Sequence, residues 1–171
     1  MKTKLFFVDA ESDGLYGSLI SIAVIVTDYA GNELERCYWG IARDKLQIQN
    51  EWVKENVEPI LGDYIECQNE QELLNRFWNV WERYYEQAYV VADVCYPVES
   101  RMFEKCIQLD IENRAMKGPF PLIDLSSLLL AKNMNPLADR TELVAMGNRK
   151  HHNALTDVEM SIEIWRKYIN E

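Results

Sequence analysis

Acidic side chains recur at spacings that could bind metal ions. Asp9 and Glu11 follow a short apolar run at positions i and i+2, and in an extended chain this spacing directs both side chains to the same face. Two carboxylates held so close repel each other, so a site that keeps both ionised generally needs a cation. Asp157 adds a third acid five residues after His152. These residues are candidates for a metal site.

A second acidic pair, Asp93 and Glu99, flanks the predicted end of a strand and the start of the next helix. Carboxylates converging from strand ends and helix starts form an all-oxygen site, which suits Mg²⁺ or Mn²⁺. Two such ions about 4 Å apart would clamp the attacking and leaving oxygens of a phosphodiester. His152, with a reference pKa of about 6.5, could take the proton from the attacking water.

Each of these residues also has a simpler interpretation when it is taken alone. The helix dipole favours acidic side chains in the first turn of a helix, which would account for Glu99 and Asp157. A lone His152 would be an exposed loop residue. It is the combination, in order and at the ends of elements, that indicates metal-dependent phosphodiester chemistry.

The elements that must position these residues follow from hydrophobic periodicity. Strands are predicted over residues 4–9, 19–27, 33–40, 89–93 and 121–123, and helices over 50–61, 70–85, 97–107, 125–131 and 153–168. Three strands come first, and strands alternate with helices afterwards. This order predicts an α/β fold in which an antiparallel three-strand meander and parallel strands form one mixed sheet flanked by helices.

Composition narrows the class of protein. The chain has 171 residues, 48% of them hydrophobic, and a net charge of −10, which predicts a single domain over residues 1–171. The negative charge argues against binding long duplex DNA or RNA and against anionic membrane surfaces. No apolar run is long enough to span a membrane, and the four scattered cysteines form no CxxC pair. A soluble, cytoplasmic protein with reduced thiols is expected.

The chain from residue 5 to about residue 166 resembles the DEDDh family of 3′–5′ exonucleases. That family includes RNase T, oligoribonuclease and the proofreading subunit of bacterial DNA polymerase III, and it shares the RNase H-like fold. Residues 6–15, Phe-Phe-Val-Asp-Ala-Glu-Ser-Asp-Gly-Leu, are similar to its first motif, and residues 152–157 match its His-x4-Asp motif. Residues 121–125 resemble its short strand before a helix.

The middle motif departs from the family pattern, in which an aspartate just inside a helix precedes large apolar residues by three and four positions. Glu99 has this relation to Met102 and Phe103, whereas Asp93 has the expected side chain but lies at the strand end. Either or both could face the metals. The altered motif also leaves open a catalytically weak or inactive family member that binds nucleic acid or acts as a scaffold.

The resemblance implies a metal-dependent exonuclease that releases nucleoside 5′-monophosphates from single-stranded ends. His152 would deprotonate the attacking water. Two ions, Mg²⁺ or Mn²⁺, would be held by Asp9, Glu11, Asp157 and one or both of Asp93 and Glu99.

The resemblance also implies how the substrate is held. Backbone around Ala10–Ser12 would meet the terminal sugar, and Leu15 would wedge against the terminal base. Apart from the resemblance, the position of His151 next to His152 predicts a neighbouring phosphate contact. For Leu15 ordinary packing, and for His151 simple solvation, remain alternatives. Short single-stranded RNA or DNA 3′ ends are the expected partners, and Tyr16 and Tyr96 are candidates for stacking.

One local basic concentration lies beside the third motif: Arg140, Arg149, Lys150, His151 and His152. It could bind a phosphate or be a solvated loop. The aromatic helix over residues 70–85 is apolar on more than one stripe, so part of it could pack on a second subunit. Relatives in the family are often homodimers, and a homodimer is therefore expected here as well.

Overall fold

The structure is a computed structural model that describes residues 1–144 and 152–170. Its six-stranded sheet has the order β4-β3-β2-β1-β5-β6. β1 pairs antiparallel with β2, and β2 with β3, whereas β1/β5, β5/β6 and β3/β4 are parallel. The strands are β1 (Lys4–Ser12), β2 (Leu19–Asp28), β3 (Glu33–Ile41), β4 (Ile65–Cys67), β5 (Ala88–Ala92) and β6 (Leu122–Asp124). The predicted mixed sheet is confirmed; β4, only three residues long, was not predicted.

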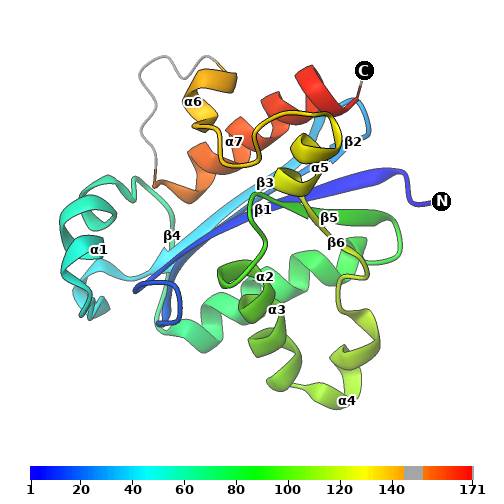
Figure 1. The fold of residues 1–171 in the computed structure, drawn as a ribbon. Helices are drawn as coiled ribbons and strands as arrows, with labels where there is room; N and C mark the ends of the chain where they lie inside the picture. Colours follow the sequence, from blue (N-terminus) through cyan, green and yellow to red (C-terminus); the bar gives the residue numbers. More distant parts are fainter. Residues whose placement is uncertain (145–151, 171) are drawn as a thin grey trace.

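Helices cover both faces of this sheet (Figure 1). α2 and α3 pack on one face, and α5 and α7 on the other. The α-helices are α1 (Glu51–Asn56), α2 (Glu70–Tyr84), α3 (Val98–Gln108), α4 (Ile111–Arg114), α5 (Leu125–Ala131), α6 (Arg140–Leu143) and α7 (Ala154–Ile164). Shorter helical segments are η1 (Arg43–Lys45), η2 (Glu58–Ile60), η3 (Ala115–Lys117) and η4 (Trp165–Ile169).

The predicted helix over residues 50–61 is in fact divided. α1 ends at Asn56, and a separate turn, η2, contains Pro59. Proline disfavours helical geometry in the residue before it and lacks the N–H that would continue the hydrogen-bond ladder. The break lets this segment bend around one end of the sheet, where it becomes a wall of the site described below.

Alternation along β1 separates two hydrophobic layers. Phe6 and Val8 face α2 and α3, and Leu5 and Phe7 face α7. The aromatic side chains of α2 pack inside the first layer, where the Phe6 and Trp81 rings lie 5.2 Å apart, edge to face. Trp78 and Trp81 are therefore buried in this chain and unavailable to a second subunit. The homodimer stays a prediction.

Among the described helices, none combines the length and apolar character that crossing a lipid bilayer requires.

Candidate functional site

β1 carries two carboxylates on the face that packs against α7. Leu5 and Phe7 occupy this face in the first half of the strand, and by alternation Asp9 and Glu11 continue it. Asp157, in the first turn of α7, meets them. One ligand atom from each of Asp9, Glu11 and Asp157 lies within 4.8 Å of the others. Asp157, distant in the sequence, is therefore brought together with the neighbouring pair Asp9 and Glu11.

The start of α7 is fixed by Asn153. Its side-chain oxygen accepts a hydrogen bond from the Thr156 amide at 3.1 Å, which caps the helix. Its side-chain nitrogen donates to the carbonyls of Ile60 and Leu61, both at 2.9 Å. One side chain thus holds the first turn of α7, including Asp157, against the segment that follows α1.

Glu99 approaches the same end of β1 from the other face of the sheet. It lies in the first turn of α3 and is only 4% exposed. Its Oε1 accepts a hydrogen bond from the backbone amide of Ala10 at 3.2 Å. Because Ala10 lies between Asp9 and Glu11, this bond places the Glu99 carboxyl beside the cluster.

Burial and mutual repulsion raise the pKa of every carboxyl in this group. Burial, followed by the charge of Asp157, raises the pKa of Glu11 to about 8. Burial is also the main cause that raises the pKa of Glu99 to about 8 and of Asp157 to about 7. The pKa of Asp9 lies well above its usual range because of burial and then the charges of Glu99, Asp157, Glu11 and Asp93. Without a cation, the four groups resist ionising together.

This donor set fits a divalent metal. It consists of carboxylate oxygens, the ligands that Mg²⁺ and Mn²⁺ prefer over nitrogen or sulfur. Three of the groups are close enough for one ion to contact them all, and bound cations would offset the repulsion that raises their pKa values.

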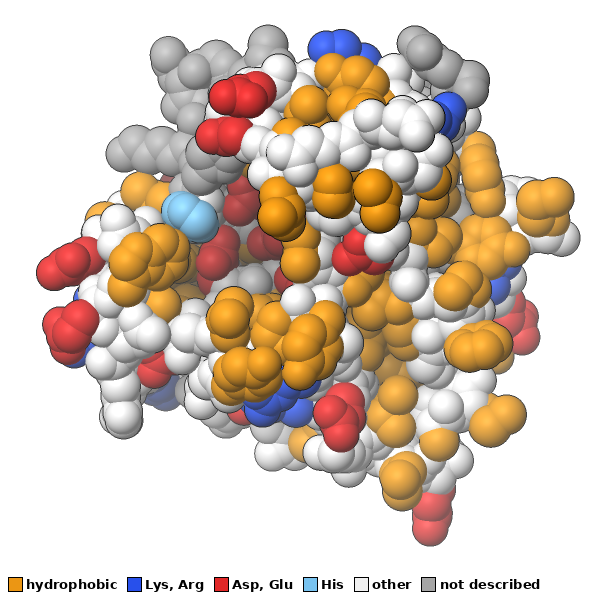
Figure 2. All heavy atoms as spheres, viewed as in Figure 1, with side chains coloured by type: hydrophobic (Ala, Val, Ile, Leu, Met, Phe, Trp, Pro, Cys, Tyr) orange, Lys and Arg blue, Asp and Glu red, His pale blue; other side chains and the backbone are white. Residues whose placement is uncertain are grey.

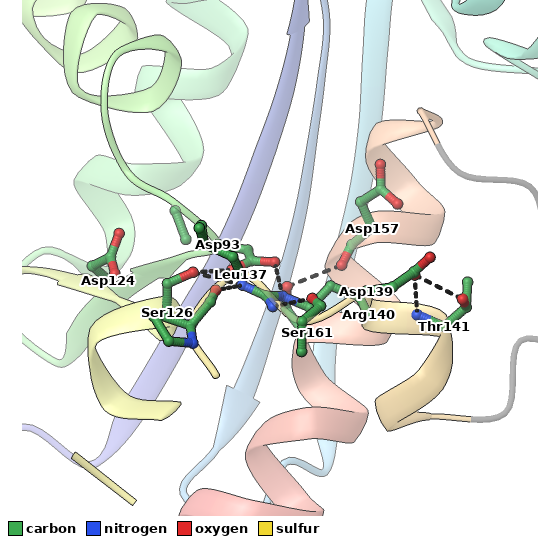
Figure 3. A network of polar contacts seen from close by, with 12 residues as sticks. Asp93, Asp124, Ser126, Leu137, Asp139, Arg140, Thr141, Asp157 and Ser161 are labelled. Atoms are coloured by element: carbon green, nitrogen blue, oxygen red, sulfur yellow. Dashed lines mark hydrogen bonds and ion pairs between the residues drawn. The ribbon is translucent and has the colours of Figure 1, made fainter. Parts of the chain in front are cut away.

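Asp93, the other candidate for the middle position, points to a different partner. Its Oδ2 accepts from Nε of Arg140 at 2.5 Å and its Oδ1 from Nη2 at 2.8 Å (Figure 3). Between Asp93 and Glu99 the chain makes a sharp turn, in which Val94 has a φ of 56° and the amide of Cys95 donates to Asp124 at 2.9 Å. The turn separates the two acids, one facing Arg140 and the other β1.

A pocket of about 400 Å³ opens beside the carboxylates. His152 is exposed at its edge, with a φ of 60°. The His152 ring meets the Trp52 ring edge to face, with centroids 5.1 Å apart and an interplanar angle of 85°. Figure 2 shows acidic side chains recessed between hydrophobic ones, with the histidine at the rim. The pocket is lined by Ala10, Glu11, Ser12, Gly14, Leu15, Asn50, Trp52, Val53, Val57, Val98 and His152.

The residues expected to contact the substrate have separate outcomes. Ala10, Ser12 and Leu15 all line the pocket, and Leu15 is 62% exposed. His151 lies outside the described residues, as do Arg149 and Lys150.

Arg140 does not belong to a solvated basic patch, because its side chain is only 12% exposed and is paired with Asp93. The prediction of a phosphate-binding or solvent-facing Arg140 is therefore wrong. An arginine that finds a carboxylate partner inside the fold forms a charge-assisted pair, and this pair removes it from the surface.

Beside the pocket, the two candidate stacking residues face each other. The hydroxyls of Tyr16 and Tyr96 are 3.5 Å apart, and both side chains are exposed. The guanidinium of Arg101 lies over the Tyr16 ring, 5.1 Å from its centroid. These contacts orient Tyr16 at the surface, where a base could stack on it.

Trp52 is a pocket residue that the sequence interpretation assigned only to a helix. Val53 and Val57, spaced by four, form the buried stripe of this segment, and Trp52 falls off that stripe. A large aromatic residue outside the buried stripe of a short helix is a signal that could have identified it.

No family model and no curated protein sequence matches this chain, but its fold matches solved structures. The zinc-bound complex of E. coli exonuclease I with single-stranded DNA gives a TM-score of 0.67 at 15% identity, covering 97% of this chain and 40% of that one. A product-bound exonuclease I gives a TM-score of 0.65 at 16% identity, covering 96% of this chain and 42% of that one. E. coli exonuclease I with a dA16 oligonucleotide gives a TM-score of 0.61 at 15% identity, covering 96% of this chain and 40% of that one.

These similarities establish the fold. The chain has an RNase H-like α/β fold built on one mixed sheet, as do the exonuclease I structures it matches. It spans about two fifths of the length of the exonuclease I chains it matches.

Proposed function

We propose that this protein is a metal-dependent 3′–5′ exonuclease of the DEDDh superfamily, acting on single-stranded nucleic-acid ends. The observation that carries the proposal is the convergence of Asp9, Glu11 and Asp157 within 4.8 Å, beside a pocket that also contains His152. The fold shared with exonuclease I supports it. The carboxylates and the pocket all come from residues 9–157, so a single domain holds every group that the proposal needs.

We assign the metal ligands to Asp9, Glu11, Glu99 and Asp157. Glu99 takes the middle position because its carboxyl reaches the Ala10 amide, whereas both oxygens of Asp93 are engaged by Arg140. Two Mg²⁺ or Mn²⁺ ions, when bound, would neutralise charge at the phosphodiester and activate water. Four carboxylates carry a formal charge of −4, which two divalent cations balance.

His152 would act as the general base in this proposal. Its imidazole is exposed at the pocket edge and can accept a proton from water that attacks the terminal phosphodiester. The edge-to-face contact with Trp52 would keep the ring at the rim of the pocket. The product would be a nucleoside 5′-monophosphate.

The pocket favours an unpaired end over a duplex. Its exposed apolar walls, Leu15 and Trp52, offer surfaces on which a splayed base can pack. Several of the similar exonuclease I structures hold single-stranded DNA, and we extend this to short single-stranded DNA or RNA ends for the present chain. The overall negative charge is consistent with a substrate held locally rather than along an extended cationic track.

The test is digestion of a 5′-labelled single-stranded oligonucleotide, as DNA and as RNA, with Mn²⁺ or Mg²⁺. The wild type should shorten it one nucleotide at a time from the 3′ end. His152→Ala should lower kcat by about 10²- to 10⁴-fold, the usual contribution of a general base. His151→Ala is the matched variant; a phosphate contact there would raise KM and leave kcat nearly unchanged.

Three results would contradict the proposal. Binding of oligonucleotide without release, under every metal and end tested, would indicate a nucleic-acid-binding or scaffold protein. Release of phosphate from mononucleotides, with oligomers left intact, would indicate a phosphatase. Equal activity of His152→Ala and the wild type would remove the proposed base.

A further inference from the structure

Arg140 is a partly buried cation next to the acidic cluster. Its side chain is 12% exposed and that of Asp93 21%. The guanidinium holds Asp93 through Nε and Nη2, one to each carboxylate oxygen. Figure 3 shows Arg140 directed at Asp93, with the Asp157 carboxylate pointing away from it. This two-point geometry is the strongest form of ion pair that arginine makes.

Further acceptors surround the same guanidinium. Nη2 also donates to Oγ of Ser126 at 2.6 Å and to the carbonyl of Pro136 at 3.0 Å. Nη1 donates to the carbonyl of Ala138 at 2.6 Å. The Ser126 hydroxyl in turn donates to Oδ1 of Asp93 at 3.1 Å. Arg140 is thus fixed from several sides, and with it the direction of the Asp93 carboxylate.

This pair differs from the other ion pairs found between described residues. In each of those, both side chains are at least 23% exposed. Surface pairs of that kind contribute little to stability, whereas the partial burial of Arg140 and Asp93 adds a desolvation cost to their pairing. The position of the pair, at the end of β5 and beside the cluster, indicates what it does.

Asp93 lies close enough for its charge to act on the cluster, since it contributes to the raised pKa values of Asp9, Glu99 and Asp157. Without its arginine, it would be a fifth carboxylate at a site where four already balance two divalent ions. A fifth would leave one negative charge in excess and offer the metals a competing ligand.

Resting on the proposed function, we infer that Arg140 is a positioning residue that withholds Asp93 from the metals. By occupying both oxygens of Asp93 it reserves the metal site for Asp9, Glu11, Glu99 and Asp157. The sequence alone left Asp93 and Glu99 as alternatives, and Arg140 is the side chain that separates their roles.

The test is a double-mutant cycle read by calorimetric titration of Mn²⁺ into metal-free protein at pH 8. Arg140→Met frees the Asp93 charge and should tighten Mn²⁺ binding by about tenfold or more. Asp93→Asn leaves Arg140 uncompensated near the cations and should weaken binding by a similar factor. The double variant removes both charges and should return to within about threefold of the wild type.

The inference predicts that the two single variants change Mn²⁺ affinity in opposite directions and that these changes cancel in the double variant. A merely structural role would weaken binding in both single variants, and that result would overturn the inference. So would a double variant as weak as Asp93→Asn, since Asp93 would then be a ligand itself.

Failure of the inference and failure of the proposed function are distinguishable. If the wild type takes up no Mn²⁺, the metal site itself is wrong; if it binds Mn²⁺ and Glu99→Gln abolishes binding, the site stands and the cycle decides the role of Arg140. Should Arg140→Met not fold, a crystal structure of the wild type with Mn²⁺ decides instead. An Asp93 carboxylate that still pairs with Arg140 in that structure supports the inference. An Asp93 oxygen about 2.1 Å from a metal overturns it.

Discussion

The face of β1 that packs against α7, here called the β1–α7 seam, is apolar in its first half and acidic in its second. In the first half of the strand, Leu5 and Phe7 are fully buried, and the Phe7 ring meets Trp165 at 6.0 Å, edge to face. In the second half, Asp9 and Glu11 meet Asp157. Both halves use the same face of the same strand. The apolar half stabilises the fold, and this stability lets the acidic half hold carboxylates together although they repel.

The largest effect should come from breaking the acidic half. Asp9→Asn removes a charge from the centre of the proposed metal site and should lower nuclease turnover by at least about a thousandfold, or about 4 kcal/mol in the activation barrier. Mononucleotide release with Mn²⁺ measures it. Glu163→Gln, on α7 but outside the cluster, is the control and should keep full activity. Comparable losses in both variants would mean that the cluster has no special role.

Next in size is damage to the apolar half. Phe7 is 0% exposed, so Phe7→Ala should cost about 3–5 kcal/mol of unfolding free energy through lost burial and the cavity left behind. Urea unfolding monitored by circular dichroism gives the value. A loss below about 1 kcal/mol would show that this half does not support the seam.

Neutralising one acid of the cluster should raise the unfolding free energy of the metal-free protein, whereas Phe7→Ala lowers it. Asp157→Asn removes a carboxyl whose pKa is raised to about 7, and we expect the metal-free protein to gain about 1–3 kcal/mol at pH 8. The same variant should lose the stabilisation that Mn²⁺ gives the wild type. Melting curves with and without Mn²⁺ test both statements, and destabilisation of the metal-free variant would refute the first.

The last expected effect needs no substitution: it is a pH dependence of the stability of the metal-free wild type. Glu11 and Glu99 have a pKa of about 8 when folded, against about 4.3 for an unfolded chain. Between these values the folded state binds more protons than the unfolded state, so stability falls as pH rises from about 4.5 to about 8. The melting temperature should fall over this range and recover when saturating Mn²⁺ is added at pH 8. A rising melting temperature without metal would contradict the raised pKa values.

Local rules were sufficient to predict one part of this site. Alternation along an extended strand places Asp9 and Glu11 on one face, and the preference for acids in the first turn of a helix accommodates Asp157. The three-strand meander and the parallel strands after it followed from the order of the elements alone. Each of these inferences uses residues that are neighbours in sequence.

The rest depends on contacts between distant residues. Asp93 and Glu99 are directed to different partners by a turn in which Val94 adopts a positive φ, a conformation that β-branched side chains rarely adopt and that no sequence pattern predicts. Arg140 turns inward because it pairs with Asp93, a residue 47 positions earlier in the chain. Sequence periodicity predicts which face of an element is buried, but it does not identify the partner that a charged side chain meets.

Asn153 has a consequence for protein engineering. It caps α7 and also holds the carbonyls of Ile60 and Leu61, while its neighbour His152 rests on Trp52. Residues 50–61 and 152–157 therefore depend on each other and would have to be transferred together into a chimeric protein. A chimera that imports only one of these segments from another protein of this fold would separate the histidine from Trp52, whereas one that imports both would transfer the pocket wall and the histidine together.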